Sequence, residues 1–168
     1  LSTSFTGEDS LDIAIDSGSA SASATGAAFG FDTGVDLKVD GVTYTFPVGG
    51  ATMVVGDATD ISATFTGACA YSSFTDYTPD DCGTGNSLGV GNKGVTATLG
   101  YAFDSGFSLA GGVTSGATEI LGDDEDLIGI EAAYNADGYG VAVAYVSDDG
   151  GSGVETTYWG VNGYYTFD

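Results

Sequence analysis

Positive charge is almost missing from this chain. Its 168 residues include two Lys or Arg residues and no His, against 24 Asp or Glu residues, so the formal net charge is −22. A protein that binds phosphate backbones needs a basic surface, so this composition argues against nucleic acid as a partner. It also disfavours electrostatic binding to anionic lipid headgroups. A net negative charge of this size is typical of a solvated acidic surface or of a protein that binds or conducts cations.

Long apolar runs are also missing. No stretch approaches the roughly 18 consecutive apolar residues that indicate a transmembrane helix. The opening residues, LSTSFTGEDS, have neither the basic start nor the apolar centre of a signal peptide. Because the chain does not begin with Met, we expect a mature or trimmed product, or a fragment of a longer protein. Hydrophobic residues make up 42%, which distinguishes the chain from a disordered acidic tail.

The motifs of catalysis and metal binding are absent as well. The chain lacks His and a Gly-x-Ser-x-Gly elbow, and spacing assigns no acid and base roles among its many carboxylates. The acidic clusters at 123–126 and 148–149 lack the ligand spacing of a calcium-binding EF-hand loop, so we interpret them as solvated loops. We therefore expect neither an enzyme nor a bound cofactor or metal.

What the chain does have is alternation with a period of two, which is typical of strands with one apolar face. We expect an all-β fold of about ten strands in an antiparallel up-and-down order, with no helix. The pair Asp40-Gly41 predicts a hairpin turn, and Pro47 should end its strand or lie at a sheet edge. Part of 16–34, where Phe29 and Phe31 share a face, is expected to be strand. The apolar faces lie at 11–15, 35–39, 42–46, 95–103, 107–113, 128–134, 139–145 and 157–167.

One long irregular segment, 57–93, interrupts this pattern. A loop of that length inside a compact domain is usually functional or disordered. It contains both cysteines, Cys69 and Cys82, and no His is present to complete a metal site with them. We expect them to form a disulfide in an oxidising compartment, with two free thiols as the alternative.

Two all-β architectures are compatible with this alternation. In a soluble sandwich the apolar faces point inward, whereas in a transmembrane β-barrel they face lipid and the other faces line a lumen. The opposite faces here carry small and polar residues, aromatics gather near strand ends, and long loops alternate with tight turns, which favours the barrel. Asp12, Asp16, Glu131, Tyr158 and Asn162 would then face the lumen. The aromatic residues expected to face the membrane are Trp159, Tyr165 and Phe167.

Several stretches resemble the cyanobacterial outer-membrane porins of the carbohydrate-selective porin family. They are TSFTGEDSL, VTYTFPVG, LGVGNKGVTATLGYAF, DLIGIEAAYNADGYGVAVAYV and YWGVNGYYTF. The resemblance implies an antiparallel barrel of roughly sixteen strands in the cell outer membrane, existing as a monomer or a homotrimer. It also implies passive diffusion of small hydrophilic solutes or inorganic ions.

The resemblance also implies an N-terminal domain that binds the cell wall. We expect two departures from the family pattern here, namely a missing cell-wall-binding domain and only about ten strands. We therefore expect residues 1–168 to be either a single smaller barrel or the N-terminal part of a larger one, and favour the latter.

Within a pore, the 57–93 loop is the candidate constriction. Charges in such a loop set ion selectivity, so Asp76, Asp80 and Asp81 would favour cations passing through an acidic lumen. An external loop that never meets the pore is the alternative. The competing function is a secreted acidic surface-layer or structural β-protein, stabilised by calcium between neighbours. A porin requires detergent to stay in solution, whereas a surface-layer module does not.

Overall fold

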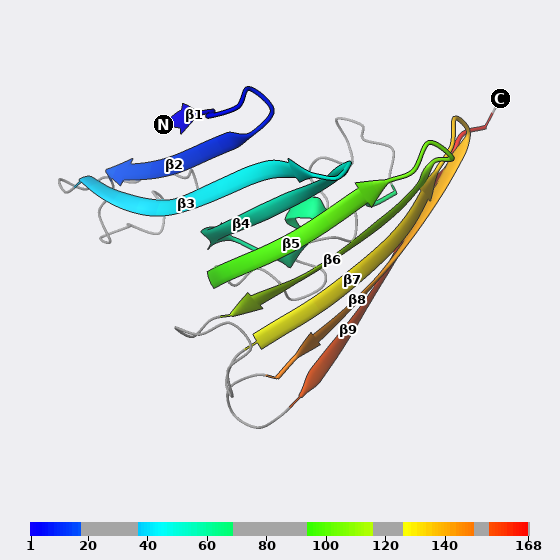
Figure 1. Cartoon of the computed structure of the whole chain (residues 1–168). Helices are drawn as coiled ribbons and strands as arrows, with labels where there is room; N and C mark the ends of the chain where they lie inside the picture. The colour runs from blue at the N-terminus through cyan, green and yellow to red at the C-terminus, as the bar shows by residue number, and fades with distance from the viewer. Residues whose placement is uncertain (18–36, 69–93, 116–125, 150–154, 168) are drawn as a thin grey trace.

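The computed structural model describes residues 1–17, 37–68, 94–115, 126–149 and 155–167. These residues form one antiparallel sheet of nine strands in the order β1 to β9, plus one turn of 3-10 helix, η1 (Figure 1). The all-β, up-and-down prediction is therefore confirmed. Residues 18–34 of the segment 16–34, in which a further strand is expected, lie outside the described residues. The elements are β1 (Ser2–Thr3), β2 (Ser10–Ser17), β3 (Leu37–Val48), β4 (Ala51–Thr59), η1 (Ile61–Thr64), β5 (Gly94–Ala102), β6 (Phe107–Ser115), β7 (Asp126–Asn135), β8 (Tyr139–Asp148) and β9 (Thr156–Tyr165).

The two ends of the sheet differ in the length of their connections. At the tight-turn end, short links join β3 to β4, β5 to β6 and β7 to β8. Gly49 and Gly50 form the first of these links. Their φ angles are 57° and 89°, which residues other than glycine rarely adopt. The strand ends that the longer connections 18–36, 60–93 and 116–125 join lie at the opposite end of the sheet, the long-loop end. This is the alternation of long loops and tight turns that the sequence predicted.

The hairpin predicted at Asp40-Gly41 is wrong. β3 runs through both residues, and its turn into β4 comes later, at Gly49 and Gly50. In the pairing with β2, Ala14 lies opposite Gly41 but Ile15 lies opposite Val39, so the register shifts at Asp40. A β-bulge of this kind adds one residue to a strand. The apolar residues therefore move from odd-numbered positions before the bulge to even-numbered positions after it, as they would across a turn.

Pro47 lies where a proline is tolerated in a sheet. The last β3 residue that pairs with β2 is Thr45, opposite Ser10. Pro47 therefore has a partner only on the β4 side, opposite Thr52. This is the edge position that the sequence predicted.

The two faces of the sheet have opposite characters, because paired residues in neighbouring strands point to the same side. Large apolar side chains on the first face, the outer face, are exposed to the surroundings. The second face, the inner face, carries small and polar side chains, and many of these are buried. Exposed outer-face residues include Leu99, Leu109, Ile128, Ile130, Val141, Val143, Trp159, Val161 and Tyr165.

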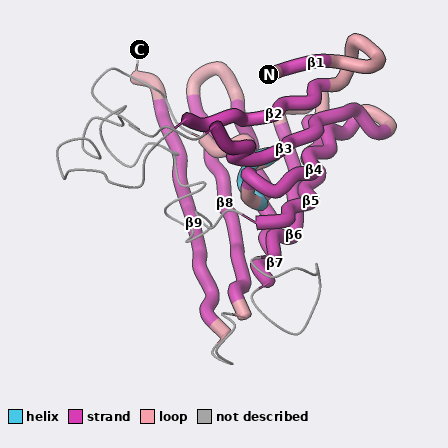
Figure 2. The backbone as a smooth tube through the Cα atoms, turned by 90° about the vertical axis from the view of Figure 1, so that its left-hand side faces the viewer, coloured by secondary structure: helices cyan, strands magenta, loops and turns pink. Residues whose placement is uncertain are grey.

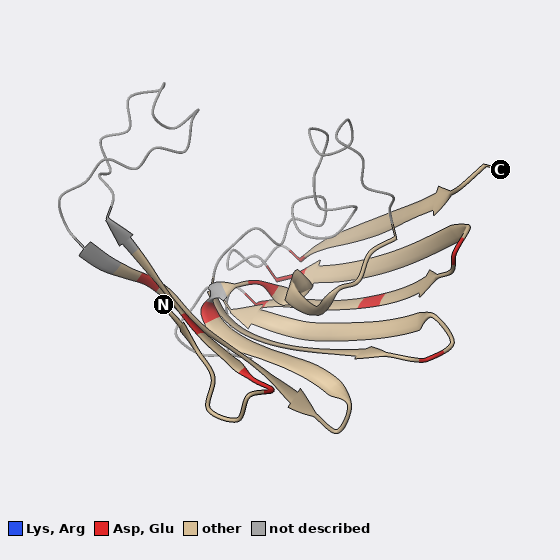
Figure 3. Ribbon diagram, turned by 90° about the horizontal axis from the view of Figure 1, so that it is seen from above, with Lys and Arg blue, Asp and Glu red and all other residues tan. Residues whose placement is uncertain are grey.

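The sheet curves, and η1 lies inside the curve (Figures 2 and 3). The core forms here, between the inner face and the segment around η1. Ile61 packs with Leu127, Ala144 and Val146. Further along, Ala68 packs with Ala133 and Ala142. The polar face is thus the covered one.

The described sheet is not closed into a barrel, since its strand order ends at β1 on one side and at β9 on the other. Acidic residues occupy few positions along its strands (Figure 3). No helix in the described part of the chain is long and apolar enough to cross a membrane.

Candidate functional site

Residues 60–68, which we call the strap, cross the inner face from the β4 side towards β9. They form the first part of the segment that the sequence predicted to be a long loop; β4 itself continues to Thr59. Asp60 starts η1 by accepting a 2.8 Å hydrogen bond from the amide of Ser62 through its side chain. Residues of η1 then contact β4, β5, β6 and β7. The strap therefore lies across the middle of the curved face.

Glu131 of β7 is the charged anchor of the strap. Its Oε1 accepts hydrogen bonds from the amides of Thr66, at 2.6 Å, and Gly67, at 3.3 Å. The side chain is only 4% exposed. A buried carboxylate is stable only when its oxygens find donors, and the strap backbone supplies them. Glu131 lies on the predicted face, but its carboxylate holds the strap.

Two amide side chains anchor the far end of the strap. Asn162 of β9 accepts a 2.8 Å hydrogen bond from the amide of Ala68 through Oδ1. Asn135 of β7 donates a 3.1 Å hydrogen bond from Nδ2 to the carbonyl of Gly67. Gly67 has a φ of 63°, which turns the backbone so that its amide and carbonyl both meet the sheet. Asn162 was predicted to lie on this face, whereas Asn135 was not singled out.

Threonine hydroxyls hold the near end of the strap. Thr64 and Thr98 of β5 share a 2.6 Å hydrogen bond between their Oγ1 atoms. Thr98 also donates to the carbonyl of Ile61 at 3.2 Å, and Thr96 donates to the carbonyl of Thr59 at 2.9 Å. Both β5 threonines are at most 2% exposed. These buried hydroxyls thus bond the backbone on both sides of Asp60, where the chain passes from β4 into the strap.

Glycines of the inner face make room for the strap. A Cβ at Gly129 of β7 would collide with Cδ1 of Ile61, and one at Gly100 of β5 would lie 2.9 Å from Cβ of Thr64. Larger residues at either position would push the strap away from the sheet. These small residues are the signal in the sequence that another segment covers this face.

A small cavity remains beside the strap, towards the tight-turn end. Its volume is about 300 Å³, and it opens between the strap and strands β4 and β5. Its described lining carries no charged side chain. The lining residues are Gly50, Thr52, Ala63, Thr64, Phe65, Thr66, Gly100, Tyr101 and Ala102.

The other predicted lumen residues are placed as follows. Asp12 lies on the inner side of β2, is exposed, and accepts a 2.6 Å hydrogen bond from Ser10 Oγ. Tyr158 lies on the inner side of β9 and packs against the Ile61 core. The backbone of Asp16 pairs with Lys38, and its side chain lies outside the described residues. Also outside the described residues are the predicted constriction residues, Asp76, Asp80 and Asp81, and the predicted disulfide residues, Cys69 and Cys82.

The outer face carries the aromatic residues expected to meet a membrane. Trp159 and Tyr165 are 68% and 66% exposed, and Phe167, just beyond β9, is 87% exposed. Trp159 and Tyr165 are six residues apart, about 20 Å at the ~3.4 Å rise of a strand. This is comparable to the apolar band of an outer-membrane barrel, about 25 Å tall.

Aromatic pairs also gather at the tight-turn end. Rings of Phe107 and Tyr134 lie 4.6 Å apart, and those of Tyr165 and Phe167 lie 5.0 Å apart. Tyr101 and Phe103 form another pair at 4.6 Å. The pairs therefore mark one end of strands β5 to β9, as an interfacial girdle would.

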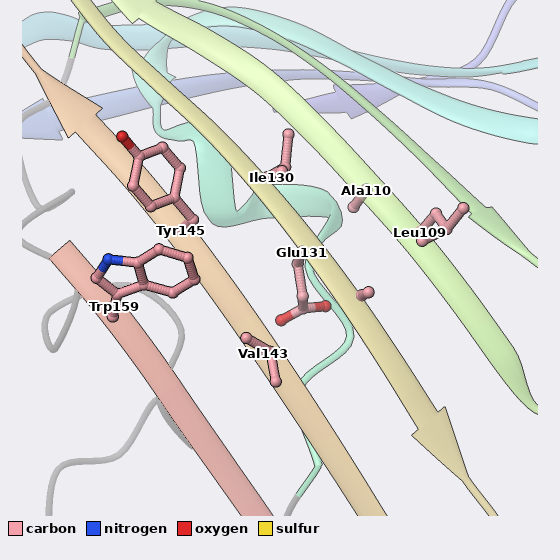
Figure 4. Close-up of a pocket in the computed structure, with 8 residues that line it drawn as sticks. Leu109, Ala110, Ile130, Glu131, Val143, Tyr145 and Trp159 are labelled. Atoms are coloured by element: carbon pink, nitrogen blue, oxygen red, sulfur yellow. The ribbon is translucent and has the colours of Figure 1, made fainter. Parts of the chain in front are cut away.

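A shallow apolar groove of about 670 Å³ crosses the outer face from β6 to β9 (Figure 4). Tyr145 and Trp159 form one wall, with ring centroids 4.8 Å apart. Leu109, Ile130 and Val143 contribute the rest of its apolar lining. Ala132 lies at the bottom of the groove, between the larger side chains of Leu109 and Val143.

At the tight-turn end, Asp9 organises the loop between β1 and β2. Its carboxylate accepts hydrogen bonds from Ser4 Oγ at 2.7 Å, Tyr44 OH at 2.7 Å and both polar groups of Thr6. These donors, with Ser4 contributing most, hold the pKa of Asp9 far below its usual range. The loop is thus built around an ionised carboxylate.

The described residues contain no cluster of three or more Asp, Glu, Cys or His side chains that could hold a metal ion. Comparisons of the chain with protein-family models, with curated proteins and with solved structures each find no match. The features of the described residues that bear on function are the two faces of the sheet and the strap.

Proposed function

We propose that this chain is an outer-membrane porin that gives passive diffusion of small hydrophilic solutes or inorganic cations. The observation that carries the proposal is the inverted burial of the sheet. Val143 and Ile130 on the outer face are 40% and 60% exposed, whereas Thr98 and Glu131 on the inner face are at most 4% exposed. In a barrel within a membrane, apolar side chains face lipid and polar ones face the lumen.

This inversion is costly in water. Each square ångström of apolar surface left in water forgoes about 25 cal/mol of stabilisation, and contiguous exposed apolar patches usually mark a membrane or protein contact. Here the exposed apolar residues continue over the outer face from β5 to β9. A lipid environment would cover this surface. The chain's low content of Lys and Arg fits the same environment, because a soluble sheet usually exposes such residues on its outer face.

The strap supports a constriction in the proposed pore. It lies on the face that would line the lumen, and Glu131, Asn135 and Asn162 hold it there. The chain continues from it directly into the segment with Asp76, Asp80 and Asp81. We infer that the strap directs this segment into the lumen, where its carboxylates would favour cations.

Conductance across a planar lipid bilayer tests the proposal. The chain, refolded in detergent, should produce discrete, stable conductance steps, and the urea-unfolded chain serves as the control. A chain that stays in solution without detergent and gives no conductance would instead support a secreted surface-layer protein. Cell fractionation should place the protein in the outer membrane.

Reversal potentials in a salt gradient test the selectivity separately. Replacing Asp76, Asp80 and Asp81 by Asn should shift the reversal potential towards zero, because the three charges would be removed from the constriction. The matched control replaces three acidic residues in the connections at the tight-turn end by Asn or Gln, namely Glu8, Asp104 and Asp137. If both triple variants keep the selectivity of the original chain, the three Asp residues are not part of the filter.

A further inference from the structure

Two acidic residues, Asp126 and Asp149, meet at the long-loop end of the sheet. Asp126 begins β7 and Asp149 directly follows β8, and these strand ends lie side by side (Figure 1). The amide of Asp126 donates a 2.7 Å hydrogen bond to Oδ1 of Asp149, and the amide of Asp149 donates a 3.1 Å hydrogen bond to the carbonyl of Asp126. The fold thus brings together one residue from each of the acidic clusters 123–126 and 148–149.

The prediction that the 123–126 cluster is solvated is wrong for Asp126. Its side chain is only 6% exposed, and its Oδ1 is buried with no hydrogen-bond partner among the described residues. A buried carboxylate oxygen without a partner is unfavourable, and a bound water or ion accounts for such an atom. Asp126 therefore offers a buried oxygen to a ligand.

Asp149 places a second carboxylate beside the first. Leu127 pairs with Asp148, so Asp126 and Asp149 are the next opposite pair in the β7–β8 register. Opposite residues of an antiparallel pair point to the same side with their Cβ atoms about 5 Å apart, and like charges in this position repel each other. A positive ion between the two carboxylates would turn this repulsion into attraction.

This part of the chain has no cationic side chain to offset the pair. Residues 94–168, which include β5 to β9, contain no Lys, Arg or His. On its other side Asp126 pairs with Ser115 of β6, which is uncharged. Glu155, just before β9, adds a further acidic side chain. A bound cation supplies the charge that these strands lack.

We propose that the carboxylates of Asp126 and Asp149 bind a divalent cation, and that calcium fits best. Calcium takes oxygen ligands in a flexible geometry, whereas zinc sites use mainly Cys and His, which residues 94–168 lack. Because the site has two acidic ligands, water completes the coordination shell, and we expect a dissociation constant of about 0.1–1 mM. The ion would tie the start of β7 to the end of β8.

Denaturant unfolding of the refolded protein in detergent tests the site. Calcium chloride at about 5 mM, above the expected dissociation constant, should raise the unfolding midpoint relative to EDTA with sodium chloride at equal ionic strength. Asp126→Asn and Asp149→Asn should each lose this shift. The Asn at 149 keeps an acceptor oxygen for the amide of Asp126 and removes only the charge. The matched control, Asp137→Asn, lies in the exposed turn at the other end of the same hairpin and should keep the shift.

The calcium-free arm separates loss of the ion from loss of the fold. Without calcium, Asp126→Asn should unfold at the same or a higher denaturant concentration than the original chain, because a buried charge without a partner is removed. Calorimetric titration with calcium should show one ion fewer per chain for this variant than for Asp137→Asn.

An equal calcium shift in Asp126→Asn and Asp137→Asn would overturn the proposal, because calcium would then only screen the acidic surface. Absence of any shift in the original chain would overturn it as well. None of these measurements involves conductance, so either result leaves the porin proposal intact.

Discussion

The amide of Thr66 lies 2.6 Å from Oε1 of Glu131, and the two residues are 65 positions apart in the chain. This hydrogen bond joins the strap to the centre of β7. It also gives the Glu131 carboxylate a hydrogen-bonded place under the strap, because Gly67 contributes a second backbone donor. The bond thus links the polar inner face of the sheet to the loop that we place in the pore.

Removing the Glu131 carboxylate should loosen the strap. Glu131→Ala leaves the amides of Thr66 and Gly67 without their acceptor, which costs about 1–3 kcal/mol for buried groups. Hydrogen–deuterium exchange at these two amides should therefore become at least several-fold faster. Glu8→Gln removes a carboxylate from an exposed turn and should leave their exchange unchanged. Equal protection in both variants would show that the strap does not depend on Glu131.

Gly129→Ala should displace η1 from the sheet. The new Cβ would collide with Cδ1 of Ile61, which is fully buried. Overpacking of this kind costs about 1–3 kcal/mol, measured as a lower midpoint in denaturant unfolding of the refolded protein. Gly138→Ala is the matched control, because nothing lies within 4 Å of its Cβ position. The proposed packing is wrong if the two variants unfold at the same denaturant concentration.

Acid should weaken the contribution of Asp9 to stability. The folded-state pKa of Asp9 is lowered by its donors, with Ser4 first, so its contribution is fully present above the unfolded pKa of about 3.9. It then decreases as the pH falls from there towards the folded pKa. The difference in unfolding free energy between the original chain and Asp9→Asn should accordingly be larger at pH 7 than at pH 2.5. Denaturant unfolding of both proteins at the two pH values measures this difference, and an equal difference at both would contradict the hydrogen-bonded carboxylate.

Introducing a charged residue on the outer face should show whether this face contacts lipid or water. In lipid, Val143→Arg at the middle of β8 should destabilise folding by about 2–4 kcal/mol, while Phe103→Arg beside a tight turn should cost about 0–1 kcal/mol. Both residues are similarly exposed, at 40% and 44%. In water, substitutions at such positions usually change stability by about 0.5 kcal/mol or less. Equal, small effects measured by folding into lipid vesicles would contradict a lipid-facing outer surface.

Much of the fold could be predicted because a strand's faces follow from alternation alone. Alternation in the sequence predicts the positions of β5 to β9 and their apolar faces, and the structure confirms them. The bulge at Asp40 could not be read in this way. A hairpin and a bulge both shift the apolar positions by one, and only the pairing of Ala14 with Gly41 and Ile15 with Val39 distinguishes them.

The candidate site was predictable only in part. Alternation placed Glu131 and Asn162 on the face opposite the apolar one, and the structure confirms both positions. Their contacts with the strap could not be predicted, because the residues that meet are 64 to 94 positions apart. Asn135 was missed for the same reason, since nothing in its local sequence points to Gly67.

The sequence by itself determined that the chain forms strands and which side of each strand is apolar, because side chains alternate every second residue. Its glycines and loop lengths also placed the tight turns and long connections at opposite ends of the sheet. Only the tertiary structure decided that the polar face is the covered one. That result depends on where the strap, a segment distant in sequence, packs. Glu131 stabilises the strap on this face because its carboxylate accepts hydrogen bonds from the strap's amides.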